Sequence, residues 1–222
     1  TNILFNAPTP GGFAPTSNWF INLPGYVINK GWEVSFGYKI IKGKNFSWDA
    51  NYNMTFVKNE LRDMPVPVIT GGVSGQGLTG AYAQTFTNGQ PLFTWSMPVF
   101  RGFDGNGNAR YENGAQNQLV GTAIPNFFAG LTNNFTLGNW SLSVFANAVT
   151  GFHVYNNTAN ALFLKGSLRN GRNVIYSAGT SAENPFNPGS VSTRFLEKGD
   201  FIRISNVNLS YAFNLKSSKV IK

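Results

Sequence analysis

The chain has 222 residues, 17 of them Lys or Arg and 9 Asp or Glu, which gives a formal net charge of +8. Charged residues make up 12%, against roughly 25% in an ordinary soluble domain, while aromatic residues reach 15%. Cysteine is absent, which excludes disulfides and thiolate metal sites, and no run approaches the ~20 apolar residues of a membrane-spanning helix. Few charges combined with many rings and small polar residues favour a sheet with one apolar and one neutral polar face.

Residues 32–56 alternate between bulky apolar and polar side chains on both sides of a short turn at 43–45. A period of two predicts β-strands, and strands of this length with a neutral polar face are typical of a transmembrane β-barrel. In such a barrel the apolar face contacts lipid and the polar face a wet lumen. We predict lipid contact for Trp32, Phe36, Tyr38, Trp48, Tyr52, Trp140 and Leu142. We predict lumen contact for Glu33, Asp49, Asn51, Asn53, Ser141 and Asn147.

Three further stretches show the same alternation. Residues 127–137 and 140–149 form a second predicted hairpin around Gly138-Asn139, and residues 206–213 form a last strand. A weaker pair lies at 92–103 and 108–113, joined by Asp104-Gly105-Asn106-Gly107, where Asp-Gly and Asn-Gly steps suit a tight hairpin turn. The sequence thus predicts about seven or eight antiparallel strands of a larger up-and-down barrel.

The connections between these strands fall into two length classes. Those at 43–45, 104–107 and 138–139 are short, whereas those at about 60–91, 113–125 and 157–200 are longer. Short and long links alternate, which predicts short periplasmic turns on one rim and long extracellular loops on the other. The Gly and Asn content of the long loops leads us to expect mobile segments.

The start of the chain carries no export signal. Thr1-Asn2-Ile3-Leu4-Phe5 has neither a basic region nor an apolar signal segment. A barrel protein must be exported, so we expect these residues to be an internal piece of a longer protein.

Four segments together resemble one protein family. Asn29-Lys30-Gly31-Trp32-Glu33-Val34, followed by Phe46-Ser47-Trp48, resembles the N-K-G-x-E hairpin of SusC/RagA-type TonB-dependent transporters. Residues 92–105 resemble the following strand of that family, and 124–131 resemble its P-x-x-x-x-G-L strand start. Residues 199–211 resemble its R-I-x-N-V-x-L-S-Y strand. The segments occur in the family's order and span the chain from Thr1 to about Phe213.

This resemblance implies a fold, a location and an activity. Residues 1–222 would form a late part of a barrel in the bacterial outer membrane, without the plug domain and the TonB box. The whole protein would import oligosaccharides or oligopeptides, energised by TonB-ExbB-ExbD through its N-terminal part. A SusD-like surface lipoprotein would cover its extracellular mouth, and no cofactor is implied. The alternative is a passive or structural outer-membrane barrel, such as a porin, adhesin or secretion component, which would have no plug domain or TonB box upstream.

The candidate ligand or partner residues lie in the two longest loops. Rings and guanidinium groups stack on sugars and peptides, and these loops supply Tyr82, Phe86, Arg169, Arg172 and Tyr176. Lys165, Arg194 and Lys198 add positive charge near the last three, which suits an anionic ligand or a partner. The alternative interpretation is a set of solvated loop side chains.

Two sequence motifs with acidic residues could be either functional sites or ordinary structural features. Asp104-x-Asn106-x-Asn108 has the oxygen spacing that opens a calcium loop, but Gly is missing from the sixth position and Glu from the twelfth. A hairpin turn is therefore preferred. Glu60 and Asp63 are flanked by basic residues, which favours a solvated loop base over acid–base catalysis.

Other chemistries find little support in the sequence. His153 is the only histidine and has no cysteine or second histidine with which to form a zinc site. The basic residues are scattered and the rings fall on the apolar strand face, which argues against nucleic-acid binding. No Ser/His/Asp or phosphate-cradling motif stands out, so we do not expect an enzyme.

Overall fold

The computed structural model describes residues 3–8, 18–75 and 77–213, and it confirms the predicted all-β antiparallel class. By its contacts the chain divides into two compact units. We call Gly31–Val57, Pro125–Thr150 and Asp200–Lys222 the strand unit. We call Thr1–Lys30, Lys58–Ile124 and Gly151–Gly199 the loop unit.

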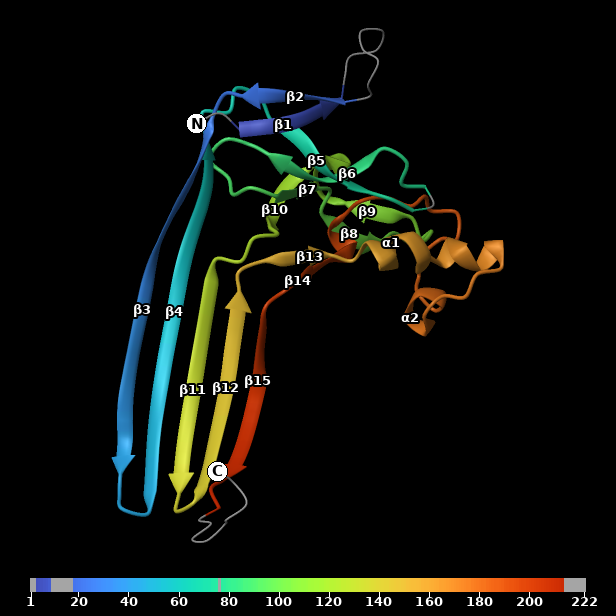
Figure 1. Ribbon diagram of the computed structural model, residues 1–222. Coiled ribbons are helices and arrows are strands. Elements are labelled where there is room, and N and C mark those ends of the chain that lie inside the picture. Colours follow the sequence, from blue (N-terminus) through green and yellow to red (C-terminus); the bar gives the residue numbers. More distant parts are fainter. Residues whose placement is uncertain (1–2, 9–17, 76, 214–222) are drawn as a thin grey trace. The chain divides into compact units, whose positions relative to one another are not determined.

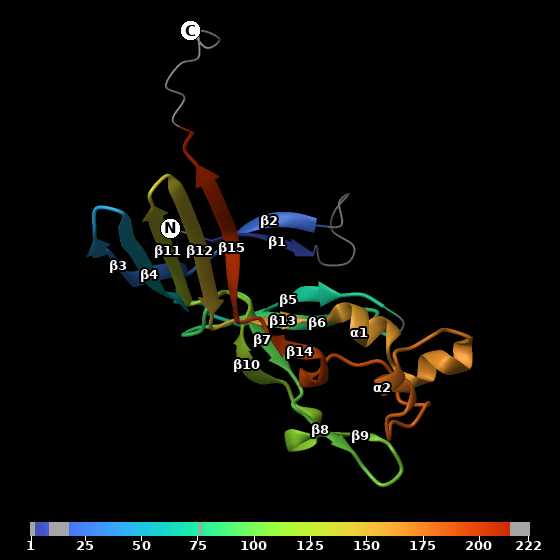
Figure 2. The same cartoon turned by 90° about the horizontal axis from the view of Figure 1, so that it is seen from below.

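The strand unit is built on one five-stranded sheet with the order β15-β12-β11-β4-β3 (Figures 1 and 2). Its members are β3 (Tyr26–Lys42), β4 (Phe46–Arg62), β11 (Phe127–Leu137), β12 (Trp140–Thr150) and β15 (Phe201–Tyr211). All five coincide with predicted strands, although β3, β4 and β15 begin or end several residues beyond the predicted bounds. The strands have 11 or 17 residues, and a barrel strand needs about 9–11 to cross a bilayer.

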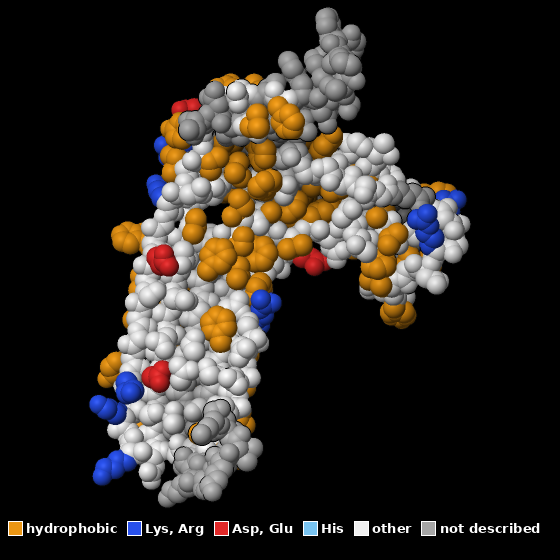
Figure 3. Space-filling view, in the orientation of Figure 1, with side chains coloured by type: hydrophobic (Ala, Val, Ile, Leu, Met, Phe, Trp, Pro, Cys, Tyr) orange, Lys and Arg blue, Asp and Glu red, His pale blue; other side chains and the backbone are white. Residues whose placement is uncertain are grey.

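The register aligns the apolar residues of neighbouring strands. Tyr52 pairs with Leu131, and Leu131 pairs with Ala146, so all three point to the same side of the sheet. On the other side, Asn53 and Asn147 both pair with Gly130. The predicted division of residues between two faces is confirmed, whereas contact with lipid or lumen remains a prediction. Figure 3 shows a side of these strands on which uncharged polar side chains and backbone predominate.

Aromatic pairs occupy both ends of the apolar face. Towards the short turns, Trp48 stacks on Phe135 with ring centroids 5.6 Å apart, and Trp140 meets Tyr211 at 4.8 Å. At the opposite end of the paired region, where β11 begins, Phe56 of β4 meets Phe127 at 4.6 Å. Positions 48 and 56 lie roughly 27 Å apart along a strand, close to the ~25 Å apolar band between the aromatic girdles of outer-membrane barrels.

A β-bulge in β15 keeps its apolar residues on one face. Ile204 pairs with Ala146 and Asn206 pairs with Phe145, so Ser205 has no residue opposite it. Ile202 and Ile204 have even numbers, whereas Val207 and Leu209 have odd numbers. The extra residue absorbs this change, and both pairs stay on the apolar face.

Both outer strands of the sheet lack a neighbour on one side. Among the described residues, β3 pairs only with β4 and β15 only with β12. Residues 29–42 of β3 and residues 202–211 of β15 are exposed throughout.

Five long strands replace the seven or eight predicted. The weak pair at 92–103 and 108–113 forms β7 (Thr94–Met97), β8 (Phe100–Phe103) and β9 (Ala109–Tyr111), none of which pairs with the five-stranded sheet. Strands of three or four residues are too short to cross a bilayer. The turn at 104–107 joins β8 to β9 within the loop unit, so its predicted place among the short rim turns is wrong.

The loop unit has regular structure of its own. A four-stranded sheet has the order β10-β7-β6-β5, and two-stranded sheets are formed by β1 with β2, β8 with β9 and β13 with β14. The remaining strands are β1 (Ile3–Pro8), β2 (Asn18–Leu23), β5 (Val68–Val73), β6 (Ala81–Phe86), β10 (Gln118–Thr122), β13 (His153–Tyr155) and β14 (Leu196–Lys198). The helices are α1 (Asn157–Leu162), α2 (Tyr176–Gly179) and the 3-10 helices η1 (Glu112–Ala115), η2 (Lys165–Asn170) and η3 (Thr193–Phe195).

One core joins the long loops within this unit. Ala83, Trp95 and Met97 are buried, and residues from all three long loops pack against them. These packed residues are Val73, Val120, Ala123, Tyr155, Val191 and Leu196. Burial raises the pKa of Tyr155, whose ring lies 6.0 Å from that of Trp95, to about 12. The expectation of mobile loops, drawn from their Gly and Asn content, finds no support in this arrangement.

Candidate functional site

The polar face of the strand unit carries a chain of hydrogen bonds across three strands. Asn134 Nδ2 on β11 donates to Asp49 Oδ2 on β4 at 2.9 Å, and Ser143 Oγ on β12 donates to Asn134 Oδ1 at 2.8 Å. Arg203 Nε donates to Asn147 Oδ1 at 3.2 Å. These links hold polar side chains in place on a face of amides and hydroxyls.

A hollow of about 290 Å³ lies on the same strands, lined by residues of β3, β4, β11 and β12. Gly130 forms part of its floor, because a Cβ there would lie 2.5 Å from Asn53 Oδ1 and 3.2 Å from the Phe145 ring. Any larger residue at 130 would displace the amide or the ring. The lining of the hollow combines aromatic residues, Phe145 among them, with amide and hydroxyl groups, a combination suited to neutral polar ligands.

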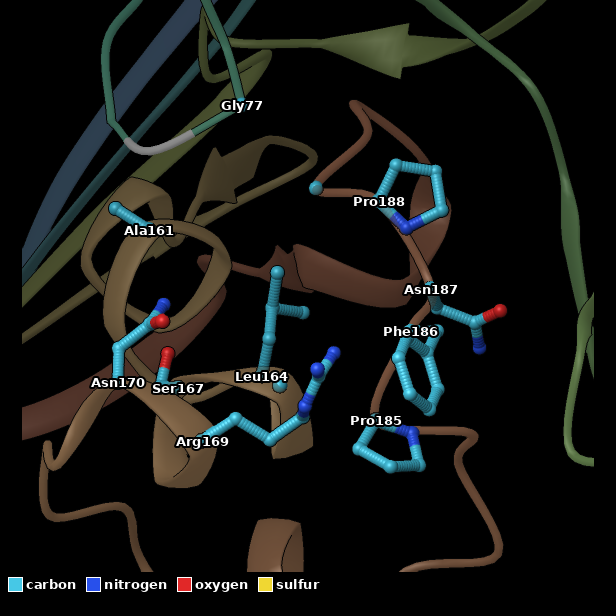
Figure 4. A pocket seen from close by; sticks show the side chains of 12 residues that line it. Gly77, Ala161, Leu164, Ser167, Arg169, Asn170, Pro185, Phe186, Asn187 and Pro188 are labelled. Atoms are coloured by element: carbon cyan, nitrogen blue, oxygen red, sulfur yellow. The ribbon is translucent and has the colours of Figure 1, made fainter.

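The loop unit contains a second cavity, of about 270 Å³ (Figure 4). Its walls come from η2, the end of α1 and the segment 185–189, with Gly77 at one side. Leu164, Pro185 and Pro188 supply apolar surface, while Ser167, Asn170 and Asn187 supply polar groups. We call this cavity the loop pocket.

Among the described residues that line the loop pocket, Arg169 is the one that carries a charge. Its Cζ lies 3.8 Å from the centroid of the Phe186 ring, and Figure 4 shows its side chain extended towards that ring. A guanidinium stacked on a ring keeps its N–H groups free in the plane. Both side chains are exposed, Phe186 to 72%, so the pair presents a cation on an aromatic support to an entering ligand.

The buried carboxylate of Glu183 links the two walls of this pocket. Arg194 binds both carboxylate oxygens of Glu183, at 2.6 and 3.0 Å, and Glu183 is only 3% exposed. The backbone N–H of Lys165, at the start of η2, donates to Glu183 Oε2 at 3.0 Å. Beside it, a Cβ on Gly166 would lie 2.7 Å from the carbonyl oxygen of Pro185, so only glycine allows this close approach.

The structure separates the five predicted loop residues. Arg169 lines the pocket, whereas Arg172 and Tyr176 are exposed outside its lining. Tyr82 is 51% exposed on β6, and Phe86 packs edge-on against Phe93 with centroids 5.4 Å apart. The sequence analysis missed Phe186 and the two prolines beside it, for which Asn-Pro-Phe-Asn-Pro at 184–188 is the available signal.

The turn at Asp104 has the predicted hairpin geometry. Asp104 Oδ1 accepts the backbone N–H groups of Asn108 at 2.8 Å and of Asn106 at 2.9 Å. Hydrogen bonding lowers the pKa of this carboxyl below its ordinary value. The largest contribution comes from the backbone N–H of Asn108, and the Asn108 side-chain amide and the Asn106 N–H add to it. The carboxylate is thereby engaged in the turn, and the described residues contain no group of three or more potential metal ligands.

Glu60 also has a structural setting. Its carboxylate lies 2.8 Å from Lys58 Nζ and 2.8 Å from Arg62 Nε. These two hydrogen bonds, with Lys58 first, lower the pKa of Glu60 from 4.5 to about 2. A carboxylate held ionised between two cations is a poor general acid. The predicted solvated loop base is wrong for Glu60, because this residue lies on β4 and is only 8% exposed.

His153 is the first residue of β13. Its backbone oxygen accepts a hydrogen bond of 3.1 Å from Trp95 Nε1, and its side-chain Nδ1 is buried without a hydrogen-bond partner.

The fold and the two-faced sheet are those of a segment of an antiparallel β-barrel of the outer-membrane class. No family model matches the chain. Among curated proteins it is 23% identical to the TonB-dependent receptor P39 of Formosa agariphila, over 96% of this chain and 26% of that protein. It is 26% identical to the TonB-dependent receptor SusC of Bacteroides thetaiotaomicron, over 89% of this chain and 22% of that protein.

Solved structures agree with these sequence matches. The chain aligns with a structure of the RagAB peptide transporter with a TM-score of 0.70 and 15% identity, over 94% of this chain and 25% of that one. The chain also aligns with the RagAB peptide importer in its closed-closed state, with a TM-score of 0.75 and 16% identity. This alignment covers 99% of this chain and 27% of that one. The predicted resemblance to SusC/RagA-type TonB-dependent transporters is confirmed. The chain spans about a quarter of the length of these relatives. None of its described helices is long and apolar enough to cross a membrane.

Proposed function

We propose that this chain forms part of the barrel wall of an outer-membrane active importer. The observation that carries the proposal is the register of β4, β11, β12 and β15 within the five-stranded sheet. It aligns an apolar face bounded by aromatic pairs and an opposite neutral polar face. Similarity to TonB-dependent receptors along most of the chain supports the same conclusion. In this proposal the polar face lines the lumen of a barrel in the bacterial outer membrane.

The barrel of this proposal includes strands beyond those of residues 1–222. The exposed outer edges of β3 and β15 carry backbone donors and acceptors, and each unpaired group in lipid costs several kcal/mol. Barrels that hold a plug have about 22 strands, so most strands, the plug domain and the TonB box would lie outside this segment. A closed, monodisperse barrel formed in detergent by residues 1–222 alone would contradict this part of the proposal.

The proposed partners and substrates follow from the relatives. The intact protein would draw energy from TonB-ExbB-ExbD, work with a SusD-like surface lipoprotein and import oligopeptides or oligosaccharides. Leu168, Ile175 and Tyr176 are 47%, 49% and 85% exposed in the loop unit, and they offer apolar surface for the lipoprotein. The candidate residues Tyr82 and Phe86 would contact the substrate or the lipoprotein from β6.

Uptake with and without TonB tests the proposal. Cells that carry the intact protein would take up a fluorescent oligopeptide or oligosaccharide only when TonB is present. Uptake that is unchanged in a strain lacking TonB would instead identify a passive barrel. A Tyr176→Ala variant tests the lipoprotein contact by pull-down, with Ile69→Ala, an exposed apolar residue on β5, as its control.

A further inference from the structure

Arg169 carries a positive charge that no described residue neutralises. No carboxylate of the described residues lies within ion-pair distance of its guanidinium, and its one recorded contact is the Phe186 ring. The nearby Glu183 is buried, and its two oxygens are engaged by Arg194 and by the Lys165 N–H. The described lining of the loop pocket therefore has an exposed cation and no accessible anion.

The groups around this cation are held in place before any ligand binds. The guanidinium of Arg169 packs on the Phe186 ring. Glu183, paired with Arg194, accepts the backbone N–H of Lys165 and so ties the start of η2 to the segment that carries Phe186. A site with its side chains already ordered loses less conformational entropy on binding, so more of the interaction energy appears as affinity.

We propose that the loop pocket binds the carboxylate group of a ligand, with Arg169 as the recognition residue. The planar guanidinium fork matches the two oxygens of a carboxylate. Leu164, Pro185 and Pro188 receive the apolar group next to that carboxylate, and Ser167 and Asn170 bond to its neighbouring polar atoms. The inference rests on the proposed import function, since it assigns an acidic end to the imported molecule.

Two kinds of imported nutrient could supply the carboxylate that the loop pocket binds. An oligopeptide supplies a C-terminal carboxylate, and an acidic oligosaccharide supplies the carboxylate of a uronic acid. A cavity of about 270 Å³ holds only the terminal residue or sugar of either ligand, so the remainder of the ligand would extend outside the pocket.

The test is calorimetric titration of the purified intact protein in detergent, without TonB or the lipoprotein. The probes are a tripeptide with a free C-terminus, the same tripeptide as its C-terminal amide, a uronic-acid disaccharide and the matched neutral disaccharide. A charge-assisted bidentate contact predicts that one acid binds about 10–100-fold more tightly than its neutral analogue. The acid that shows this difference identifies the source.

Variants separate recognition from general damage to the loop. Arg169→Ala should remove the preference for the acid, and Arg169→Lys should restore only part of it, because an ammonium keeps the charge and loses the fork. Arg172→Ala is the matched control, an exposed arginine three residues away that does not line the pocket, and it should leave binding unchanged. Circular dichroism of each variant checks that the protein is folded.

Two results would overturn the inference. The first is equal affinity of the parent protein for the acid and its neutral analogue. The second is an equal loss of affinity for the acid in the Arg169→Ala and Arg172→Ala variants. Because binding is measured without TonB, its outcome is independent of uptake. Binding without TonB-dependent uptake would refute the import function alone, and uptake without acid preference would refute the carboxylate site alone.

Discussion

The Trp48 indole Nε1 donates a hydrogen bond of 3.1 Å to Asn133 Oδ1 between two neighbouring strands of the strand unit. Asn133 is the one polar residue in the apolar row of β11, where its strand partners are Ala50 and Val144. An amide that faces lipid has no water to bond with, so the indole supplies the missing donor. The pair explains how this position tolerates a polar side chain.

We predict that Trp48→Phe destabilises the intact barrel by about 1–2 kcal/mol, because it removes this donor in a nonpolar surrounding. In an Asn133→Leu background the same change should cost clearly less, since no acceptor is left unpaired. Urea unfolding of the protein in lipid bilayers, arranged as a double-mutant cycle, measures the difference. A coupling energy near zero would show that the hydrogen bond contributes nothing to stability.

The two faces of β3 should respond differently to a positive charge. Phe36 lies on the apolar face, with its ring 5.4 Å from that of Tyr52, whereas Ser35 precedes it on the polar face. Phe36→Arg at mid-membrane is expected to cost roughly 2–4 kcal/mol, and Ser35→Arg much less, because arginine faces lipid only in the first. Equal costs in bilayer unfolding experiments would contradict the assignment of the faces.

The strand unit was predictable because its information is local. Alternation with a period of two marks both a strand and its two faces, and a slip by one residue would exchange them. This signal placed β3, β4, β11 and β12 and assigned Trp48 and Asp49 to opposite sides. For β15 the prediction began at residue 206, five residues after the strand itself starts.

The reason for that miss is the bulge at Ser205. Alternation assumes an unbroken period, and the change from even to odd apolar positions between Ile204 and Val207 appears as the end of the pattern. In the loop unit the stabilising contacts join distant residues, such as Trp95 with Tyr155 and Arg169 with Phe186. No local pattern reports such pairs, so the sequence predicted Arg169 as a candidate but neither Phe186 nor the pocket.

Single-residue deletions in β15 test the bulge. Deletion of Ser205 joins Ile204 to Asn206, whose partners Ala146 and Phe145 are already adjacent, so the ladder becomes regular and no side chain changes face. We expect the barrel to assemble, with a loss of about 1 kcal/mol for the hydrogen bond from Ser205 to Asn147. Deletion of Asn208 is the matched control, because it makes Val207 and Leu209 adjacent and sends one of them to the polar face.

Assembly of the two deletion variants is followed by the heat-dependent mobility of the intact barrel on detergent gels. The Ser205 deletion should give the folded band in near-parental amounts, and the Asn208 deletion should give little of it. Similar yields from both deletions would mean that the register of β15 is not fixed by its apolar residues.

The ion pairs of Glu60 should make the stability of the protein depend on pH. We place the membrane-spanning part of β4 at residues 46–57, so Glu60 lies outside it, near the end of the strand. Its carboxylate is held between Lys58 and Arg62, and its pKa is lowered from 4.5 to about 2. A carboxyl with a lowered pKa in the folded state stabilises the protein fully above its unfolded pKa, and this stabilisation is lost as the pH falls through the folded pKa. The relevant window therefore runs from about pH 4.5 down to about pH 2.

We expect Glu60→Gln to lower the Tm of the intact protein at neutral pH, because the amide cannot pair with either cation. The difference in Tm from the parent should shrink below about pH 4.5 and be mostly lost by about pH 2, where the parent carboxyl is about half protonated. Thermal unfolding in detergent, followed by circular dichroism at several pH values, provides the measurement. Glu112→Gln, which breaks the exposed pair with Arg101, is the control and should change the Tm little at neutral pH. A Glu60→Gln difference that persists unchanged to pH 2 would show that the side chain acts through packing, because only an ionic contribution is titrated away.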